Sequence, residues 1–137
     1  MSRIMAIDYG DARTGVALSD LTGTLAGQAQ TFTLTGKALL NALTALAKDN
    51  QVGTVVVGLP RNMDGSLGPR AQVSQDFAQK LTGRGLTVVL RDERLTTVSA
   101  HNILKDNGRS GKRRKPVVDA VAATLILQEY LDFLKLG

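Results

Sequence analysis

The order of the predicted elements indicates an α/β protein with a mixed sheet and helices packed against it. Three strand-like segments come first, and helix-like and strand-like segments alternate after them. Residues 54–57 read Thr-Val-Val-Val, which is typical of a strand covered on both faces. We therefore expect five strands in one sheet, with helices on its faces.

The amino-terminal third contains three predicted strands. Residues 3–8 and 14–19 are apolar and are joined by a turn, and Val16 and Leu18 alternate as in a half-buried strand. A third strand is expected around residues 31–35. The three strands together form an antiparallel meander.

The middle of the chain alternates helices and strands. Residues 37–48 repeat apolar side chains at helical spacing, and the apolar strand at 54–57 follows. Residues 61–70 are rich in turn formers and end with a proline that enters a helix. Residues 86–90 form the last predicted strand. The inner face of the helix before it is marked by Val73, Phe77 and Leu81.

Two helices are expected after the last strand. The first opens at Thr96 or Thr97, either of which can cap it, and is stopped by Asn107-Gly108. Residues 109–115 hold five basic residues in seven, and Pro116 fits the first turn of the final helix. The buried face of the final helix is predicted to contain Val117, Val121, Leu125, Leu131 and Leu134.

Length and composition limit the classes of protein that fit. A chain of 137 residues suits one domain over residues 1–137. Hydrophobic residues make up 43% and charged residues 21%, which argues against wholesale disorder. The lack of cysteine excludes disulfides, thiolate metal sites and a cysteine nucleophile. No signal-peptide core or membrane-spanning stretch is visible, so we expect a cytoplasmic protein without a membrane partner.

The charge balance favours a polyanionic partner. The net charge is +5 and the sequence pI is near 9.9, with the positive charge partly clustered. Such a balance attracts nucleic acids through long-range electrostatics and counterion release. Nucleic acid is the partner we expect.

Three acidic residues stand in similar places. Asp8 follows the first strand, Glu93 follows the last strand, and Asp119 lies in the first turn of the final helix. If the strands at 3–8, 54–57 and 86–90 are parallel, Asp8 and Glu93 emerge at the carboxyl edge, where open α/β sheets bind ligands. Neighbouring strands lie roughly 4.8 Å apart, so the two side chains could reach a common ion. Asp119 could close the site.

Crowded acids stay ionised only where a cation offsets their repulsion and desolvation. Mg²⁺ or Mn²⁺ suits three hard oxygen ligands, whereas a lone His101 and the lack of thiols argue against zinc. Such an ion can activate water and stabilise the departing oxygen of a phosphodiester. The trio therefore predicts hydrolysis without a side-chain nucleophile.

Each acid alone also has a structural interpretation. Asp8 could be a turn residue, Glu93 with Asp92 could be a helix-entry charge, and Asp119 could favour a helix dipole. His101 is better explained as a helix-surface residue than as a catalyst. The functional hypothesis depends on the three acids together.

Basic residues near the same edge are candidate contacts to a phosphate backbone. A basic run directly precedes the helix that carries Asp119, and it is equally consistent with a solvated loop. The candidates are Arg13, Arg61, Arg70, Arg94, Lys112, Arg113, Arg114 and Lys115.

Four segments together resemble the bacterial YqgF family of pre-16S rRNA nucleases, also described as Holliday junction resolvase-like proteins. They are "DYGDARTGVALSD", "VVVGLPRNMDGSLGPRAQ", "DERLTTVSA" and "VDAVAATLILQEYL", and the match covers nearly the whole chain. The resemblance implies an RNase H-like fold, divalent-metal dependence and a role in ribosome biogenesis, maturing the 5′ end of small-subunit rRNA. It also implies that the catalytic acids are Asp8, Glu93 and Asp119.

The chain departs from the wider resolvase relatives at two positions. Those relatives typically carry a glutamate on the strand that here ends in Gly58-Leu59-Pro60. They also carry a second acid one helical turn before the final aspartate, where this chain has Pro116. The number of metal ions, one or two, therefore stays open.

Several functions remain open at this point. Resolution of branched DNA calls for a symmetric homodimer, whereas a monomer can trim RNA ends. A non-catalytic RNA-binding module is a further alternative, with the acids kept for turn geometry. An actin-like or sugar-kinase ATPase also begins with a strand that ends in Asp-x-Gly, but it needs two such domains around the nucleotide.

Overall fold

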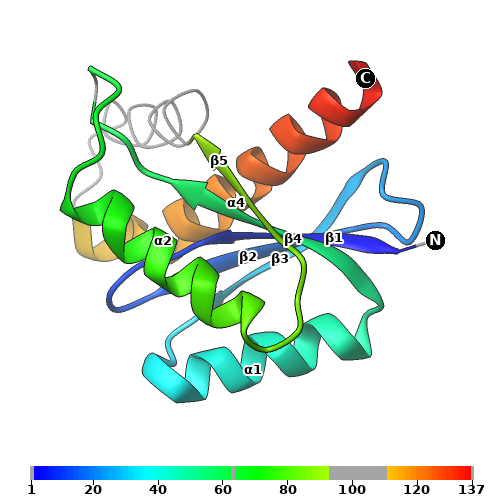
Figure 1. The fold of residues 1–137 in the computed structure, drawn as a ribbon, viewed down its shortest axis with the longest axis horizontal. Helices are drawn as coiled ribbons and strands as arrows, with labels where there is room; N and C mark the ends of the chain where they lie inside the picture. The colour runs from blue at the N-terminus through cyan, green and yellow to red at the C-terminus, as the bar shows by residue number, and fades with distance from the viewer. Residues whose placement is uncertain (1, 63, 93–110, 137) are drawn as a thin grey trace.

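The computed structural model describes residues 2–62, 64–92 and 111–136, with side chains from residue 120 onward in the last range. A five-stranded sheet with the order β3-β2-β1-β4-β5 forms its centre (Figure 1). The strands are β1 (Arg3–Asp8), β2 (Thr14–Ser19), β3 (Ala26–Phe32), β4 (Val52–Leu59) and β5 (Val88–Asp92). The described helices are α1 (Gly36–Asp49), α2 (Pro69–Thr82) and α4 (Gly111–Leu136).

The sheet is mixed, as the sequence predicts. Strand β2 is antiparallel to both β1 and β3, which confirms the meander. Strand β4 runs parallel to β1, and β5 runs parallel to β4. Strands β1, β4 and β5 therefore end at the same edge of the sheet, with β4 between the other two.

Helices cover both faces of the sheet and form two cores (Figure 1). In β1, Met5 and Ile7 point toward α1 and α2, whereas Ile4 and Ala6 point toward α4. Strand β4 contributes side chains to both cores and is buried on both faces, as expected from its β-branched run. Among the helices that the structure describes, none is long and apolar enough to cross a membrane.

The prediction for the third strand is wrong in position. The strand spans Ala26–Phe32 and overlaps the expected segment only at its end. Strand β3 lies at the edge of the sheet and is mostly exposed, so its sequence, Ala-Gly-Gln-Ala-Gln-Thr-Phe, carries no apolar alternation. Leu34, which lies in the expected segment, is beyond the end of β3 and is exposed.

The predicted buried faces of two helices need correction. Phe77 and Leu81 are buried as expected, but Val73 is 37% exposed, and the small residues Ala71 and Ser74 are buried instead. Small side chains allow a helix to lie close to the sheet, which apolar spacing alone does not reveal.

In α4 only Leu131 of the expected set is buried within the described side chains. Val121 and Leu134 are exposed, and Leu125 is only partly buried. Ala123 packs in the core between α4 and the sheet, and its neighbour Ala122 is buried, so the buried face differs from the expected one. That face contains Ala122, Ala123, Ile126, Leu127 and Leu131.

The start of the final helix also differs from the prediction. Helix α4 begins at Gly111, so neither Pro116 nor Asp119 lies in its first turn, and residues 112–115 of the basic run belong to the helix and not to a loop. Lysine and arginine are good helix formers, which favours extension of the helix on the amino-terminal side of the proline. The helix predicted between Leu95 and Asp106 lies outside the described residues.

Candidate active site

Asp8 is the last residue of β1, at the carboxyl edge of the three parallel strands. Ile7 pairs with Val57 on β4, and Val57 pairs with Leu90 on β5. By this register Asp8 lies level with Arg91, about 10 Å away across two strand spacings. The expected placement of Asp8 at this edge, with one strand between it and the end of β5, is confirmed.

Glycines flank Asp8 on both neighbouring strands. Asp8 pairs with Gly15 on β2, and the register with β4 places it level with Gly58. Neither neighbour has a side chain to cover the carboxylate at this level. Glycine within a strand is typical of a place where a ligand or another backbone approaches closely.

Asp8 lies on the face of the sheet that α4 covers. Side chains alternate along a strand, and Ile4 and Ala6, which share its parity, pack against α4. Figure 1 shows that the amino-terminal turns of α4 lie toward the edge where β1 and β4 end. The structure thus brings Asp8 and the helix that carries Asp119 to one face.

The full trio of acids falls partly outside the described residues. Glu93 is outside them, and the helix backbone at Asp119 is described without its side chain. Arg94 is outside as well, and Lys112, Arg113, Arg114 and Lys115 are described only as part of the α4 backbone. Within the described side chains, no three histidine or acidic residues form a group that could hold a metal ion.

The loop after Asp8 is attached to α2. Arg70, the second residue of α2, donates from Nη1 to Asp11 Oδ1 and from Nη2 to the carbonyl oxygen of Tyr9, both at 3.1 Å. The ring of Tyr9 stacks on Phe77, with ring centroids 4.0 Å apart and planes 12° apart. The other candidate on this loop, Arg13, is partly buried.

Arg61 lies between the ends of β4 and β5. Its Nη1 donates to the carbonyl oxygen of Gly65 at 3.0 Å, within the turn-rich loop, and its Nε lies 3.8 Å from Asp92 Oδ2. The side chains of Arg61 and Asp92 are both partly exposed. Asp92, one residue before Glu93, therefore has a cationic neighbour at the sheet edge.

An ion pair that the sequence did not reveal holds α4 against β5. Arg91 Nε donates to Glu129 Oε2 at 3.1 Å, and Arg91 Nη2 pairs with Glu129 Oε1. The guanidinium also lies over the ring of Phe133, 4.5 Å from its centroid. The partners are 38 residues apart, so no local pattern signals the contact. The pair fixes the helix that carries Asp119.

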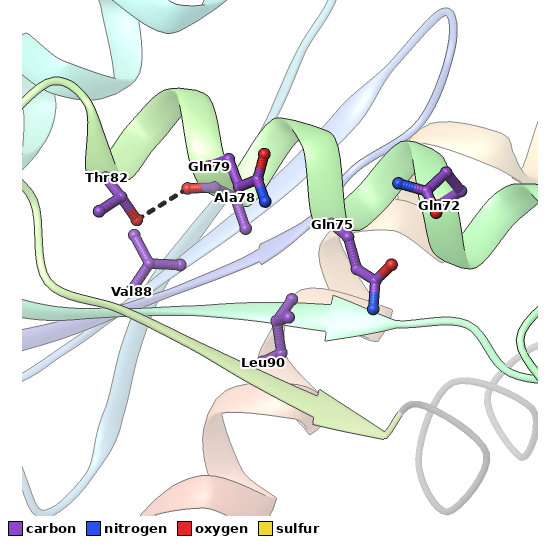
Figure 2. Close-up of a pocket in the computed structure, with 7 residues that line it drawn as sticks. All are labelled: Gln72, Gln75, Ala78, Gln79, Thr82, Val88 and Leu90. Carbon is purple, nitrogen blue, oxygen red and sulfur yellow. Dashed lines mark hydrogen bonds between the residues drawn. The ribbon is translucent and has the colours of Figure 1, made fainter.

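A separate pocket of about 390 Å³ lies between α2 and β5 (Figure 2). Its lining is uncharged and does not include Asp8. It is therefore distinct from the acidic edge of the sheet and offers no carboxylate to a metal ion. The lining residues are Gln72, Gln75, Ala78, Gln79, Thr82, Val88 and Leu90.

These features define an RNase H-like protein: a mixed five-stranded sheet with helices on both faces and an aspartate at the end of its central strand. Solved structures agree. The structure is similar to Thermus thermophilus RuvC in complex with a Holliday junction substrate, with a TM-score of 0.58, 11% identity and coverage of 100% of this chain and 97% of that one. It is also similar to the large terminase nuclease of thermophilic phage G20c, with a TM-score of 0.56, 13% identity and coverage of 90% and 80%.

Sequence comparisons identify the family. The family model described as "RuvX: Holliday junction resolvase" matches residues 2–133. A relative from Halothermothrix orenii named "Putative pre-16S rRNA nuclease" is 45% identical over 133 residues, covering 96% of this chain and 95% of the relative. One of the same name from Moorella thermoacetica is 48% identical over 132 residues, covering 95% and 94%. The chain belongs to the RuvX family, also called YqgF, which confirms the resemblance seen in the sequence.

Proposed function

We propose that the protein is a divalent-metal-dependent nuclease that hydrolyses phosphodiester bonds and processes the 5′ end of pre-16S rRNA in the cytoplasm. The observation that carries the proposal is Asp8, fixed at the end of the central strand between two glycines and facing α4. The family and the printed names of the relatives support an RNA substrate. We propose further that residues 1–137 act as a single nuclease domain.

In this proposal Asp8, Glu93 and Asp119 hold the metal ion. The fit rests on the oxygen donor of Asp8 and on the absence of side chains at Gly15 and Gly58 beside it. Arg91, two residues before Glu93, lies on β5 and pairs with Glu129 of α4, so the strand that leads to Glu93 contacts the helix that carries Asp119. When bound, Mg²⁺ or Mn²⁺ supplies an activated water and stabilises the leaving oxygen.

In this proposal, basic residues near the sheet edge bind the phosphate backbone of the substrate. A net charge of +5 draws the polyanion to the protein, and arginine forks suit bidentate contacts to phosphate. Arg61 supports this role because it lies between the ends of β4 and β5, close to the proposed centre. The other proposed contacts are Arg13, Arg94, Lys112, Arg113, Arg114 and Lys115. Arg70 is left out of this set because its guanidinium already bonds Asp11 and the Tyr9 carbonyl.

A cleavage assay tests the proposal. The purified protein is incubated with Mn²⁺, Mg²⁺ or EDTA and with labelled RNA that contains the 5′ precursor region of 16S rRNA, duplex DNA or a four-way junction. We expect metal-dependent cleavage of the RNA, abolished by Asp8→Asn, Glu93→Gln and Asp119→Asn. Asp49→Asn, which removes an exposed carboxylate at the end of α1, is the matched control and should cut like wild type.

A second candidate is a Holliday junction resolvase, favoured by the description of the family model. Junction resolution calls for a homodimer that presents two sites, whereas end processing of RNA is possible for a monomer. Sedimentation of the protein alone and with a junction separates the two states. Symmetric cleavage of the junction by a dimer, with intact RNA, would support the resolvase. Binding of RNA without cleavage by wild type would support a non-catalytic module.

A further inference from the structure

The loop between β1 and β2 begins immediately after the proposed metal ligand. Tyr9 follows Asp8 directly, and its carbonyl belongs to the Tyr9–Gly10 peptide, so a group that fixes this carbonyl fixes the chain one residue after Asp8. Arg70 bonds that carbonyl and, two residues further on, the carboxylate of Asp11. One guanidinium therefore holds two points of this loop from the start of α2.

An apolar contact holds the same loop from the same helix. The ring of Tyr9 stacks on Phe77, which is buried in the core between α2 and the sheet. Arg70 lies in the first turn of α2, and Phe77 lies two turns later. The polar and apolar contacts therefore attach the loop to a helix that itself packs on the sheet.

The backbone of this loop is tightly packed at Gly10. A Cβ added at Gly10 would lie 2.3 Å from the carbonyl oxygen of Arg13, which is backbone and cannot move aside alone. The chain thus closes tightly between Tyr9 and β2. A shift of either anchor would be transmitted along the backbone toward Asp8.

We propose that Arg70 is a positioning residue, which acts with Asp11 to hold the Asp8 carboxylate in the geometry needed to bind the metal ion. This inference rests on the proposed nuclease function. Arg70 and Asp11 are substantially exposed, 48% and 83%, and exposed pairs contribute little to global stability. The Arg70–Asp11 pair therefore determines the position of the β1–β2 loop and contributes little to the free energy of unfolding. A direct contact from Arg70 to substrate phosphate is the competing role.

A double-mutant cycle tests the positioning role. Arg70→Gln, Asp11→Asn and the double variant are compared with wild type by Mn²⁺ titration calorimetry without substrate and by kcat and KM on the RNA. Each single variant should weaken Mn²⁺ binding about tenfold, as loss of an orienting group behind a metal ligand does. The double variant should be no worse than Arg70→Gln, because both changes remove one interaction. KM and the thermal melting temperature should change little.

Two variants control for charge. Arg70→Lys keeps the positive charge but not the planar fork that bonds two acceptors, so it should behave like Arg70→Gln. Arg84→Gln removes an arginine beyond the end of α2 that donates to Asn41, and it should bind Mn²⁺ like wild type. The charge of the protein is lowered equally by Arg84→Gln and Arg70→Gln.

Opposite results would overturn the inference. Arg70 contacts the substrate instead if Arg70→Gln raises KM and leaves the Mn²⁺ affinity unchanged. In that case the losses of kcat/KM in the two single variants should multiply in the double variant. Wild-type behaviour of Arg70→Lys would point the same way. If wild type cuts no substrate while Arg70→Gln still weakens Mn²⁺ binding, the positioning role stands and the nuclease proposal fails.

Discussion

The β1–β2 loop and the β2–β3 loop each begin with an aspartate at or just after the end of a strand. Strand β1 ends in Asp8 and β2 leads into Asp20, and a glycine follows each acid within three residues. Asp20 builds its own turn: its carboxylate accepts bonds from the Thr22 hydroxyl at 2.7 Å, the Thr24 amide at 2.9 Å and the Leu25 amide at 3.2 Å. Led by the bond from Thr22, these donors hold the pKa of Asp20 well below its usual range.

The loop after Asp8 is held by a different element. Arg70 and Phe77, both on α2, bond or stack on the residues that follow Asp8. A carboxylate whose position matters to a ligand is expected to lie on a rigid element supported from behind. The two loops therefore differ in what holds them: the Asp20 turn is closed by its own donors, and the loop after Asp8 is supported from α2.

The largest effect on cleavage is expected when Asp8 and Asp20 are each replaced by asparagine in separate variants. Asp8→Asn should lower cleavage by at least about a hundredfold, because it weakens a metal ligand. Its melting temperature should stay close to the wild-type value, because asparagine keeps the size of the side chain and one of its acceptor oxygens. Asp20→Asn should cut normally but melt earlier. Cleavage rates and thermal melts of both variants check this, and full activity of Asp8→Asn would remove the distinction between the loops.

A smaller effect on cleavage is expected when the glycine of each turn, Gly10 or Gly23, is replaced by alanine. Gly10→Ala places a methyl group 2.3 Å from the backbone oxygen of Arg13, so the turn must shift. Because a small displacement of a catalytic group is costly, cleavage should fall roughly ten- to a hundredfold. Gly23 has a φ of +72°, where alanine costs about 1–2 kcal/mol, but its turn is remote from the proposed centre.

Cleavage rates and urea denaturation separate these two glycine variants. Gly23→Ala should lose stability and keep its activity, whereas Gly10→Ala should lose activity. If Gly23→Ala lowers cleavage as much as Gly10→Ala at a temperature where both are folded, the two turns are not functionally different.

The interior of the fold could be predicted from the sequence because burial leaves a strong pattern. The bounds of β1 and β2 agree with the prediction, and the apolar run of β4 was recognised as a strand covered on both faces. The edge strand β3 was misplaced because exposed side chains are free to be polar. The predicted buried face of α4 is wrong because Ala123, and not the larger Val121 and Leu134, packs against the sheet.

Of the candidate site, the sequence predicts only the positions that follow from the order and direction of the strands. Parallel strands share a carboxyl edge, so the place of Asp8 followed from the sequence. The partners of Arg70 are 59 and 61 residues away, and a contact at such separation leaves no periodic signal. The sequence therefore predicts Arg70 as a phosphate contact from its charge and its expected place on a loop near the sheet edge, whereas the structure places it in the first turn of α2. The role of Glu93 and Asp119 as ligands stays a prediction.

The smallest effect is expected in the pH dependence of the loop that Asp20 caps. The pKa of Asp20 is lower in the folded protein than in the unfolded chain, where it is about 4. Its stabilising effect is therefore complete above the unfolded value and is lost as the pH falls through the lower folded value. The urea midpoint of Asp20→Asn should lie below that of wild type at pH 7, and the gap should narrow at pH 3. Thr22→Val removes the strongest donor to the carboxylate, so it should lower the pH 7 midpoint in the same direction. An equal gap at both pH values would mean that the charge of Asp20 does not hold the turn, and the contrast with Asp8 would then rest on geometry alone.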